Sequence, residues 1–403
     1  MNKEPQECEA APNGQLSVPR RLIRRLYHAI ILFAIAVVAY NNVLGTFSVA
    51  PRQVTEPTTE TDPTKPRFPV VLIWNAFYGN FATKYLTQDR ADKCPHRCIF
   101  TRDRSRANES AAIVFHTQNF KADELPYRRS EKQIWVLFGM ESPVHTYRAI
   151  LALNGRINWT LNYRRDSDIP FPYEYNFVRL SRKGNYSLER TLNKTRMAAW
   201  FVSHCDSPSG RSMFVKELQK VIDVDIYGSC GTRRCLPPGS GECYEVLSSK
   251  YYYYLSFENS LCRDYVTEKF YSVLGYDVVP VVMGYANYSA FSPPGSYIDA
   301  LSFDSPQQLG VYMWRTVHDW GNYSSFFDWK REYKVYTDRL QAACRLCEKI
   351  YSYDYQIKVY TDIEKWFFEG GKCWSWKPNM RKPLLDEQWN VTPVPFNDER
   401  WLL

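Results

Sequence analysis

The longest apolar run of the chain lies close to its N-terminus, between Leu26 and Leu44. A helix needs roughly 20 residues to cross the ~30 Å hydrocarbon core of a bilayer, so this run is just long enough to span a membrane. The arginines that precede it are Arg20, Arg21, Arg24 and Arg25. Because basic residues favour the cytoplasmic side, the pattern predicts a cytoplasmic tail over residues 1–25 and a transmembrane signal-anchor over residues 26–45. A cleaved signal peptide is the alternative, and both predictions place the rest of the chain in the lumen or outside the cell.

A polar segment follows the apolar run. Residues 46–67 are rich in proline and threonine and include TEPTTETDPTKP. Such a composition buries little apolar surface, so the segment is predicted to be an extended stem.

Beyond the stem, short apolar runs recur at the length of buried strands. In a first block they cover Pro69–Trp74, Ala112–His116, Gln133–Phe138 and Trp159–Tyr163. In a second block the strand-like runs are Ala198–Ser203, Val224–Gly228, Tyr252–Phe257 and Val278–Met283, and they alternate with helical patterns at Arg211–Val221 and Val266–Leu274. Alternation of strands and helices implies parallel sheets.

The predicted fold class is therefore α/β, with two Rossmann-like lobes that face a ligand cleft at the C-terminal ends of their strands. A charged, turn-rich stretch over residues 173–196 separates the blocks, so we place the lobes at residues 68–195 and 196–355. Residues 356–403 form a tail with five tryptophans, which we expect to pack back on the lobes or to contact other subunits.

The composition fits a folded protein with an anionic ligand. A chain of 403 residues that is 45% hydrophobic has material for two or three compact cores. Its net charge of +8 favours a nucleotide diphosphate, a phosphoglycan or a nucleic acid as partner, without choosing among them.

Sequons and cysteines support the lumenal location. The seven N-x-[ST] sequons, which are candidate N-glycosylation sites, are Asn108, Asn158, Asn185, Asn193, Asn287, Asn322 and Asn390. Cys8 falls on the cytoplasmic side, and the other ten cysteines are compatible with five disulfides. Two close pairs, Cys94 with Cys98 and Cys344 with Cys347, could suggest zinc, but the spacing does not match structural zinc sites, so we expect disulfides and leave the pairing open.

The most informative segment for chemistry follows the predicted strand Tyr252–Phe257. This strand delivers Glu258 and Asn259 at its end, and a helix is predicted to start within Asp264–Lys269. Helix N-termini stabilise anions, and Lys269 adds a full positive charge, so the segment predicts a diphosphate site. Hydrogen bonds to a ribose and stacking contacts are available from Glu268 and Tyr265. A solvated helix face is the plain alternative.

The segments VDIYGSCG, YYYYLSFENSLCRDYVTEKF and VVPVVMGYANYSAFSPPGSYID resemble the donor-domain signature of the α1,3-fucosyltransferases. The likeness continues through WFVSHCDSPSGRSMFVKELQ and FGMESPVHT and covers most of residues 68–347. It implies lobes of the GT-B type and candidate GDP-fucose-binding residues, which are Arg211, Glu258, Asn259, Tyr265, Glu268 and Lys269. His204 departs from the pattern, because the family is expected to have Asn there.

Glu141 is the candidate catalytic base. It lies in GMESP, directly after the predicted strand Gln133–Phe138, and an inverting transfer needs a carboxylate that removes the proton of the acceptor hydroxyl. The resemblance places the family's base at this position. A surface or capping glutamate is the alternative.

The motif Asp223-Val224-Asp225 has the DxD form that many glycosyltransferases use to hold manganese. It leads into an apolar strand, so we predict a structural role and no metal site. The cations Arg211 and Lys269 would stabilise the leaving diphosphate, which makes a metal cofactor unnecessary and manganese an optional activator.

The resemblance thus implies a type II Golgi membrane enzyme that transfers L-fucose from GDP-fucose to a GlcNAc hydroxyl of a glycoprotein N-glycan, with no nucleic-acid partner. The segments GTRRC and ECYEVL are similar to those of invertebrate and plant enzymes that act on the glycan core. Other members of the family act on the antennae, so whether the acceptor GlcNAc lies in the core or in an antenna stays open. A homodimer is also left open. The alternatives are a non-catalytic membrane lectin or assembly partner with the same fold, and a metal-dependent transferase that uses the DxD pair.

Overall fold

The computed structural model describes residues 68–75, 85–173, 175–186, 194–237, 240–352 and 358–378. The predicted cytoplasmic tail, signal-anchor and stem lie outside these residues. Within them, no helix combines the length and the apolar character that a membrane span requires. The described residues all belong to one compact unit.

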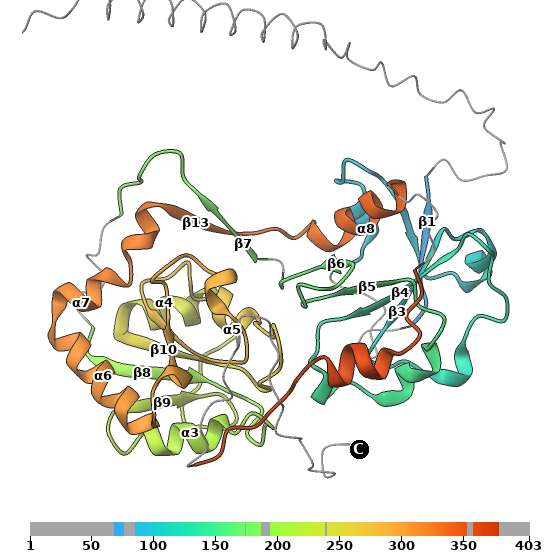
Figure 1. Ribbon diagram of the computed structural model, residues 1–403. Coiled ribbons are helices and arrows are strands. Elements are labelled where there is room, and N and C mark those ends of the chain that lie inside the picture. Colours follow the sequence, from blue (N-terminus) through green and yellow to red (C-terminus); the bar gives the residue numbers. More distant parts are fainter. Residues whose placement is uncertain are drawn as a thin grey trace, which may run out of the picture. The chain divides into compact units, whose positions relative to one another are not determined.

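The first half of this unit is built on a six-stranded parallel sheet, which we call the N-terminal sheet (Figure 1). Its order is β2-β1-β3-β4-β5-β6. The strands are β1 (Val70–Ile73), β2 (Ile99–Thr101), β3 (Ala112–His116), β4 (Ile134–Gly139), β5 (Trp159–Asn162) and β6 (Ile169–Pro170). The central strands β1, β3, β4 and β5 are buried along their whole length, as expected for a parallel sheet covered on both faces.

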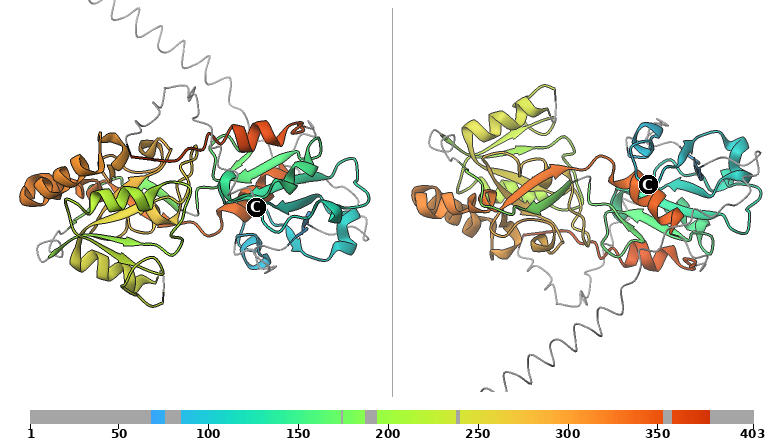
Figure 2. Two further views of the ribbon diagram at one scale, coloured as in Figure 1. Left: turned by 90° about the horizontal axis from the view of Figure 1, so that it is seen from below. Right: turned by 90° about the horizontal axis from the view of Figure 1, so that it is seen from above.

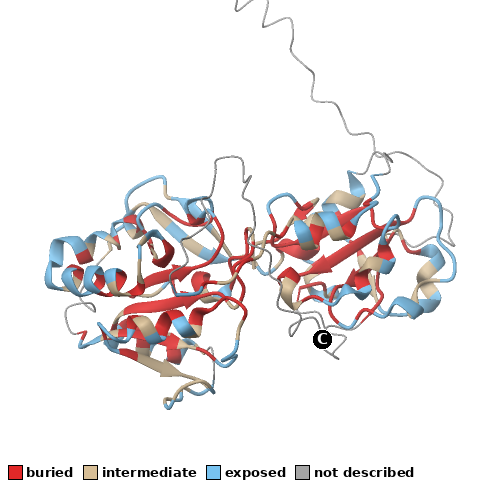
Figure 3. Ribbon diagram, turned by 60° about the horizontal axis from the view of Figure 1, so that its bottom comes forward, coloured by how far each residue is buried: buried red, intermediate tan, exposed pale blue. Residues whose placement is uncertain are grey.

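The second half is built on a five-stranded parallel sheet, which we call the C-terminal sheet, with the order β12-β11-β10-β8-β9. The strands are β8 (Arg196–Phe201), β9 (Val224–Tyr227), β10 (Tyr251–Phe257), β11 (Val279–Met283) and β12 (Ile298–Asp299). The predicted α/β class with parallel sheets is therefore confirmed. Figure 3 shows the buried strands of both sheets and the exposed outer faces of the helices around them.

Helices and short turns cover the two sheets. The α-helices are α2 (Gln88–Ala91), α3 (Arg211–Leu218), α4 (Gly241–Lys250), α5 (Glu268–Tyr271), α6 (Pro306–His318), α7 (Trp320–Ser325) and α8 (Gln341–Tyr351). Two further elements are the 3-10 turn η3 (Pro143–His145) and the π-helix η9 (Glu364–Glu369). An antiparallel pair, β7 (Tyr175–Arg179) with β13 (Tyr333–Thr337), joins the segment after β6 to the segment before α8.

The last described segment, residues 358–378, returns to both sheets, as Figure 2 shows in red. Helix α8, which falls in the range predicted for the second lobe, packs on the N-terminal sheet instead, because its cysteines form the disulfides Cys94–Cys344 and Cys98–Cys347. Tyr360 pairs with Ile157 beside β5, and Trp374 pairs with Leu261 beyond β10. The tail therefore packs back on the protein in the part that the structure describes.

The ten cysteines of the described residues form five disulfides, as their even number predicted. The remaining bridges are Cys205–Cys230, Cys235–Cys243 and Cys262–Cys373. The four cysteines considered for zinc are all oxidised pairs, which leaves no thiolate among them to bind a metal.

Candidate active site

The loops after β4 and β10 meet at the C-terminal ends of their strands. Tyr265 Oη donates a hydrogen bond to Glu141 Oε2 at 3.2 Å, and Ser142 Oγ donates to Ser260 Oγ at 2.9 Å. Burial raises the pKa of Tyr265, so this hydroxyl stays protonated and acts as a donor. The structure thus brings the predicted base, on the N-terminal sheet, to the predicted donor-binding segment on the C-terminal sheet.

The segment around Lys269 differs from the prediction in one respect. The helix starts at Glu268, inside the predicted segment and with Thr267 as its N-cap, but α5 has only four residues and is shorter than the predicted Val266–Leu274. Asp264 adopts a left-handed conformation with φ of 60°, which a helix cannot contain. So short a helix has little dipole, and the positive charge at this point comes from side chains.

Glu258 holds Thr267 and Lys269 in place through direct contacts. It is fully buried, and its carboxylate accepts hydrogen bonds from Thr267 N at 2.8 Å and from Thr267 Oγ1 at 2.8 and 3.0 Å. Lys269 Nζ lies 3.4 Å from Glu258 Oε2 and 3.1 Å from Glu268 Oε1. Burial opposes the charge of Lys269, but the two carboxylates outweigh it and raise the pKa of Lys269, which keeps this side chain cationic.

Arg211 supplies a second cation at the start of α3. Its side chain is buried, and its two terminal nitrogens donate to Phe257 O at 2.8 Å and to His204 O at 2.9 Å. Burial lowers the pKa of Arg211, but an arginine stays charged in proteins. Arg211 and Lys269 therefore place two positive charges at the end of β10.

Asn259 lies between Arg211 and Lys269 in the sequence, and its backbone contacts the segment that precedes Arg211. Its carbonyl oxygen accepts a hydrogen bond from Ser209 N at 3.1 Å, two residues before Arg211. Its side-chain Oδ1 is buried and has no hydrogen-bond partner among the described residues. The side chain is therefore available to a ligand.

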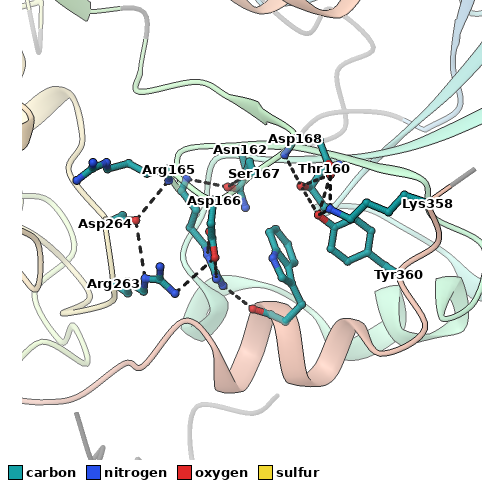
Figure 4. A network of polar contacts seen from close by, with 12 residues as sticks. Thr160, Asn162, Arg165, Asp166, Ser167, Asp168, Arg263, Asp264, Lys358 and Tyr360 are labelled. Atoms are coloured by element: carbon teal, nitrogen blue, oxygen red, sulfur yellow. Dashed lines mark hydrogen bonds and ion pairs between the residues drawn. The ribbon is translucent and has the colours of Figure 1, made fainter. Parts of the chain in front are cut away.

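A polar network ties the turn after β5 to the loop after β10 (Figure 4). Arg263 lies 3.4 Å from Asp166 and 3.9 Å from Asp264, and Arg165 N donates to Asp264 Oδ2 at 3.3 Å. Arg164 pairs with Asp166 at 2.6 Å. These contacts fix the backbone of the donor-side loop one residue before Tyr265.

The second part of this network holds the tail. Asp168 accepts hydrogen bonds from Thr160 N at 2.9 Å and from Tyr360 Oη at 2.7 Å, and it pairs with Lys358 at 2.9 Å (Figure 4). No pattern in the sequence indicated that Asp166 and Asp168 would link three distant segments, because such contacts depend on tertiary structure.

The DxD motif lies away from these loops, at the edge strand β9. Asp225 accepts from Tyr251 Oη at 2.6 Å and pairs with Arg196 at 2.7 Å and with Arg233 at 3.0 Å. Asp223 is exposed. Protein groups thus satisfy Asp225, and the described residues contain no cluster of three or more ligating side chains suited to a metal ion.

The sequons differ in their surroundings. Asn108, Asn185, Asn287 and Asn322 are exposed, while Asn193 and Asn390 lie outside the described residues. Asn158 is buried: its Oδ1 accepts from Trp135 N at 2.9 Å and its Nδ2 donates to Lys358 O at 3.0 Å. The structure therefore argues against glycosylation at Asn158.

Two parallel sheets flanked by helices define an α/β protein, and the loops after β4 and β10 bring Glu141 into contact with Tyr265. Comparison with protein families gives its class more closely. Residues 66–174 match the model described as fucosyltransferase, N-terminal, and residues 191–366 match the model described as glycosyltransferase family 10 (fucosyltransferase) C-term.

Curated relatives agree with the family models. Glycoprotein 3-alpha-L-fucosyltransferase A of Drosophila melanogaster is 36% identical over 73% of this chain and 60% of its own length, so the match leaves a substantial part of that protein uncovered. Alpha-(1,3)-fucosyltransferase C of the same organism is 35% identical over 74% of this chain and 77% of its own length. A solved α1,3-fucosyltransferase with GDP-fucose is 16% identical over 76% of this chain and 96% of that chain, at a TM-score of 0.48. The chain belongs to glycosyltransferase family 10, the fucosyltransferases.

Proposed function

We propose that this chain is an inverting α1,3-fucosyltransferase that moves L-fucose from GDP-fucose to a GlcNAc residue of a glycoprotein N-glycan. The observation that supports this most directly is the hydrogen bond between Tyr265 and Glu141, which joins a carboxylate to the segment that holds Lys269. The names of the relatives, which include a glycoprotein fucosyltransferase, support the same activity.

In the proposed reaction Glu141 removes the proton of the acceptor hydroxyl while the hydroxyl oxygen forms a bond to the anomeric carbon of fucose. The bond from that carbon to the phosphate oxygen breaks, and GDP leaves with the electron pair. Arg211 and Lys269 stabilise the negative charge that develops on the diphosphate. These cations belong to the protein, so the reaction needs no metal, and manganese would act at most as an activator.

The remaining candidate residues divide into two groups. Asn259, Tyr265 and Glu268 are proposed to contact GDP-fucose, with Glu268 on the ribose, since its side chain is 52% exposed. Glu258 is fully buried and bonded to Thr267, so we propose that it positions Lys269 and does not touch the donor.

The wider architecture follows the same proposal. The two sheets would form the two Rossmann-like lobes of a GT-B enzyme, with the acceptor bound by residues 68–195 and the donor by residues 196–355. A signal-anchor at residues 26–45 would hold the lumenal part at the Golgi membrane, and the five disulfides fit such an oxidising compartment.

The decisive experiment uses the full-length protein in detergent with GDP-fucose and a set of core and antennal GlcNAc acceptors, followed by linkage analysis of the product. We expect α1,3-linked fucose with one acceptor class, and a Glu141→Gln variant that binds GDP normally but transfers at least about 100-fold more slowly. Normal GDP binding without transfer to any acceptor would favour the lectin or assembly-partner alternative. Unchanged transfer by Glu141→Gln would show that Glu141 is not the catalytic base.

A further inference from the structure

Three of the buried polar atoms that have no partner among the described residues gather near the candidate active site. They are His145 Nε2, Arg211 Nε and Asn259 Oδ1. Buried polar groups in native proteins are almost always hydrogen-bonded, so these three atoms can pair with solvent or with a bound ligand. The sequence motifs singled out Arg211 and Asn259, but they did not indicate a role for His145.

His145 comes from the N-terminal sheet and faces the C-terminal sheet. It ends the turn η3, four residues after Glu141, and its carbonyl oxygen accepts from Gln118 Nε2 at 2.7 Å. Its ring lies 5.9 Å from the ring of His204, nearly perpendicular to it. His204 O in turn accepts from the Arg211 guanidinium, so the imidazole of His145 stands next to the proposed diphosphate cations.

The groups that act on His145 from the surrounding elements are all basic. Burial first, and then His204, Arg211 and Lys269, lower the pKa of His145 to about 4, so the imidazole is neutral near pH 7 when no ligand is bound. A diphosphate between Arg211 and Lys269 would offset their repulsion and favour the protonated ring.

We propose that His145 is a further binding residue for the leaving diphosphate, with Nε2–H donating a hydrogen bond to a phosphate oxygen of GDP. The ring takes up a proton from solvent when GDP binds, so a third positive charge is present only while the diphosphate is in place. This inference rests on the proposed function, because it takes Arg211 and Lys269 as the residues that hold the diphosphate.

The test is calorimetric titration of the full-length protein with GDP in two buffers of different ionisation enthalpy, between pH 6 and 8. The wild-type protein should take up a fraction of a proton that grows as the pH falls. His145→Gln keeps a neutral donor, so it should bind GDP without this uptake. His145→Ala should bind GDP about 10-fold more weakly or worse, since a charge-assisted hydrogen bond is lost.

Two controls separate this role from damage to the fold and from the neighbouring histidine. Guanosine, which has no phosphate, should bind the wild type and both variants alike, and an equal loss of guanosine and GDP binding would overturn the proposal. His204→Asn should retain the proton uptake. Uptake that survives in His145→Gln but disappears in His204→Asn would also overturn it. Since only binding is measured, a wild-type protein without fucose transfer would refute the proposed function and leave the result on His145 standing.

Discussion

Tyr265 and Glu141 are 124 residues apart in the sequence and share a hydrogen bond of 3.2 Å. This bond holds the Glu141 carboxylate toward the segment that is proposed to bind the donor. A general base needs a carboxylate held in a defined orientation, so this bond fits the role proposed for Glu141.

Replacement of Tyr265 by Phe should therefore reduce fucose transfer by about 10-fold, because the carboxylate loses its orienting donor. The affinity for GDP should change less than about twofold, because phenylalanine keeps the aromatic ring that is proposed to contact the donor. Tyr163→Phe is the matched control, since its ring lies 5.0 Å from that of Tyr265 and its buried hydroxyl has no partner among the described residues. Full activity of Tyr265→Phe would refute the orienting role.

Substitutions in the DxD motif distinguish a structural pair from a metal site. Asp225→Asn breaks the contacts to Arg196 and Arg233 and should lower the free energy of unfolding by about 1–3 kcal/mol. Asp223→Asn, at an exposed position, should change it by less than about 0.5 kcal/mol. Transfer by both folded variants should survive exhaustive EDTA treatment. Loss of activity in both, with recovery on addition of manganese, would instead support the metal-dependent alternative.

The sequon at Asn158 should remain unmodified. Its side-chain amide bonds to Trp135 and Lys358 inside the protein, so a glycan at Nδ2 would have to displace the chain at residue 358. Mass spectrometry after enzymatic deglycosylation in heavy-oxygen water should label some of the exposed sequons, such as Asn108 and Asn287, but not Asn158. Asn158→Gln should destabilise the protein by about 1–3 kcal/mol, whereas Asn108→Gln should not. A labelled Asn158 would contradict the described packing.

Stability should fall as the pH drops from about 6.5 towards 4, in part because of His116. Burial lowers the pKa of His116 to about 4. The imidazole therefore binds a proton near pH 6.5 in the unfolded chain but stays neutral in the folded protein. The full effect is about 3 kcal/mol, which is present above pH 6.5 and lost towards pH 4.

Urea unfolding at pH 7.5 and pH 4.5 measures this dependence. His116→Asn, which can still accept from Gln118 N, should lose less stability between the two pH values than the wild type does. His318→Gln, at an exposed position, should behave as the wild type does. Equal pH dependence in all three proteins would exclude His116 as a contributor.

Much of the core of the fold could be predicted from the sequence because buried strands of a parallel sheet are continuous apolar runs. The predicted Ala112–His116 and Tyr252–Phe257 coincide with β3 and, to within one residue, β10. The short edge strand β2 lacks such a run, since Ile99–Thr101 is only partly buried. The helix predicted at Val266–Leu274 is shorter in the structure, where α5 covers only Glu268–Tyr271. Its start is fixed by the hydrogen bond from Thr267 N to the Glu258 carboxylate.

The candidate site could likewise be predicted from the sequence only in part. The linear motif made Lys269 and Asn259 recognisable, and its family pattern drew attention to Glu141. Tertiary contacts then determined what the sequence could not: the fully buried position of Glu258, and the approach of His145 to His204 from another sheet.

The return of helix α8 and residues 358–371 to the N-terminal sheet bears on how the protein is made. A ribosome synthesises strands β1 to β6 first, yet the segments that bind Cys94, Cys98 and Asp168 emerge only after the entire C-terminal sheet. During synthesis, the N-terminal sheet therefore receives its last contacts after all strands of the C-terminal sheet have been made. The N-terminal sheet reaches its final form only after residues 341–371 have been made, so its core stays incomplete until most of the chain has been synthesised.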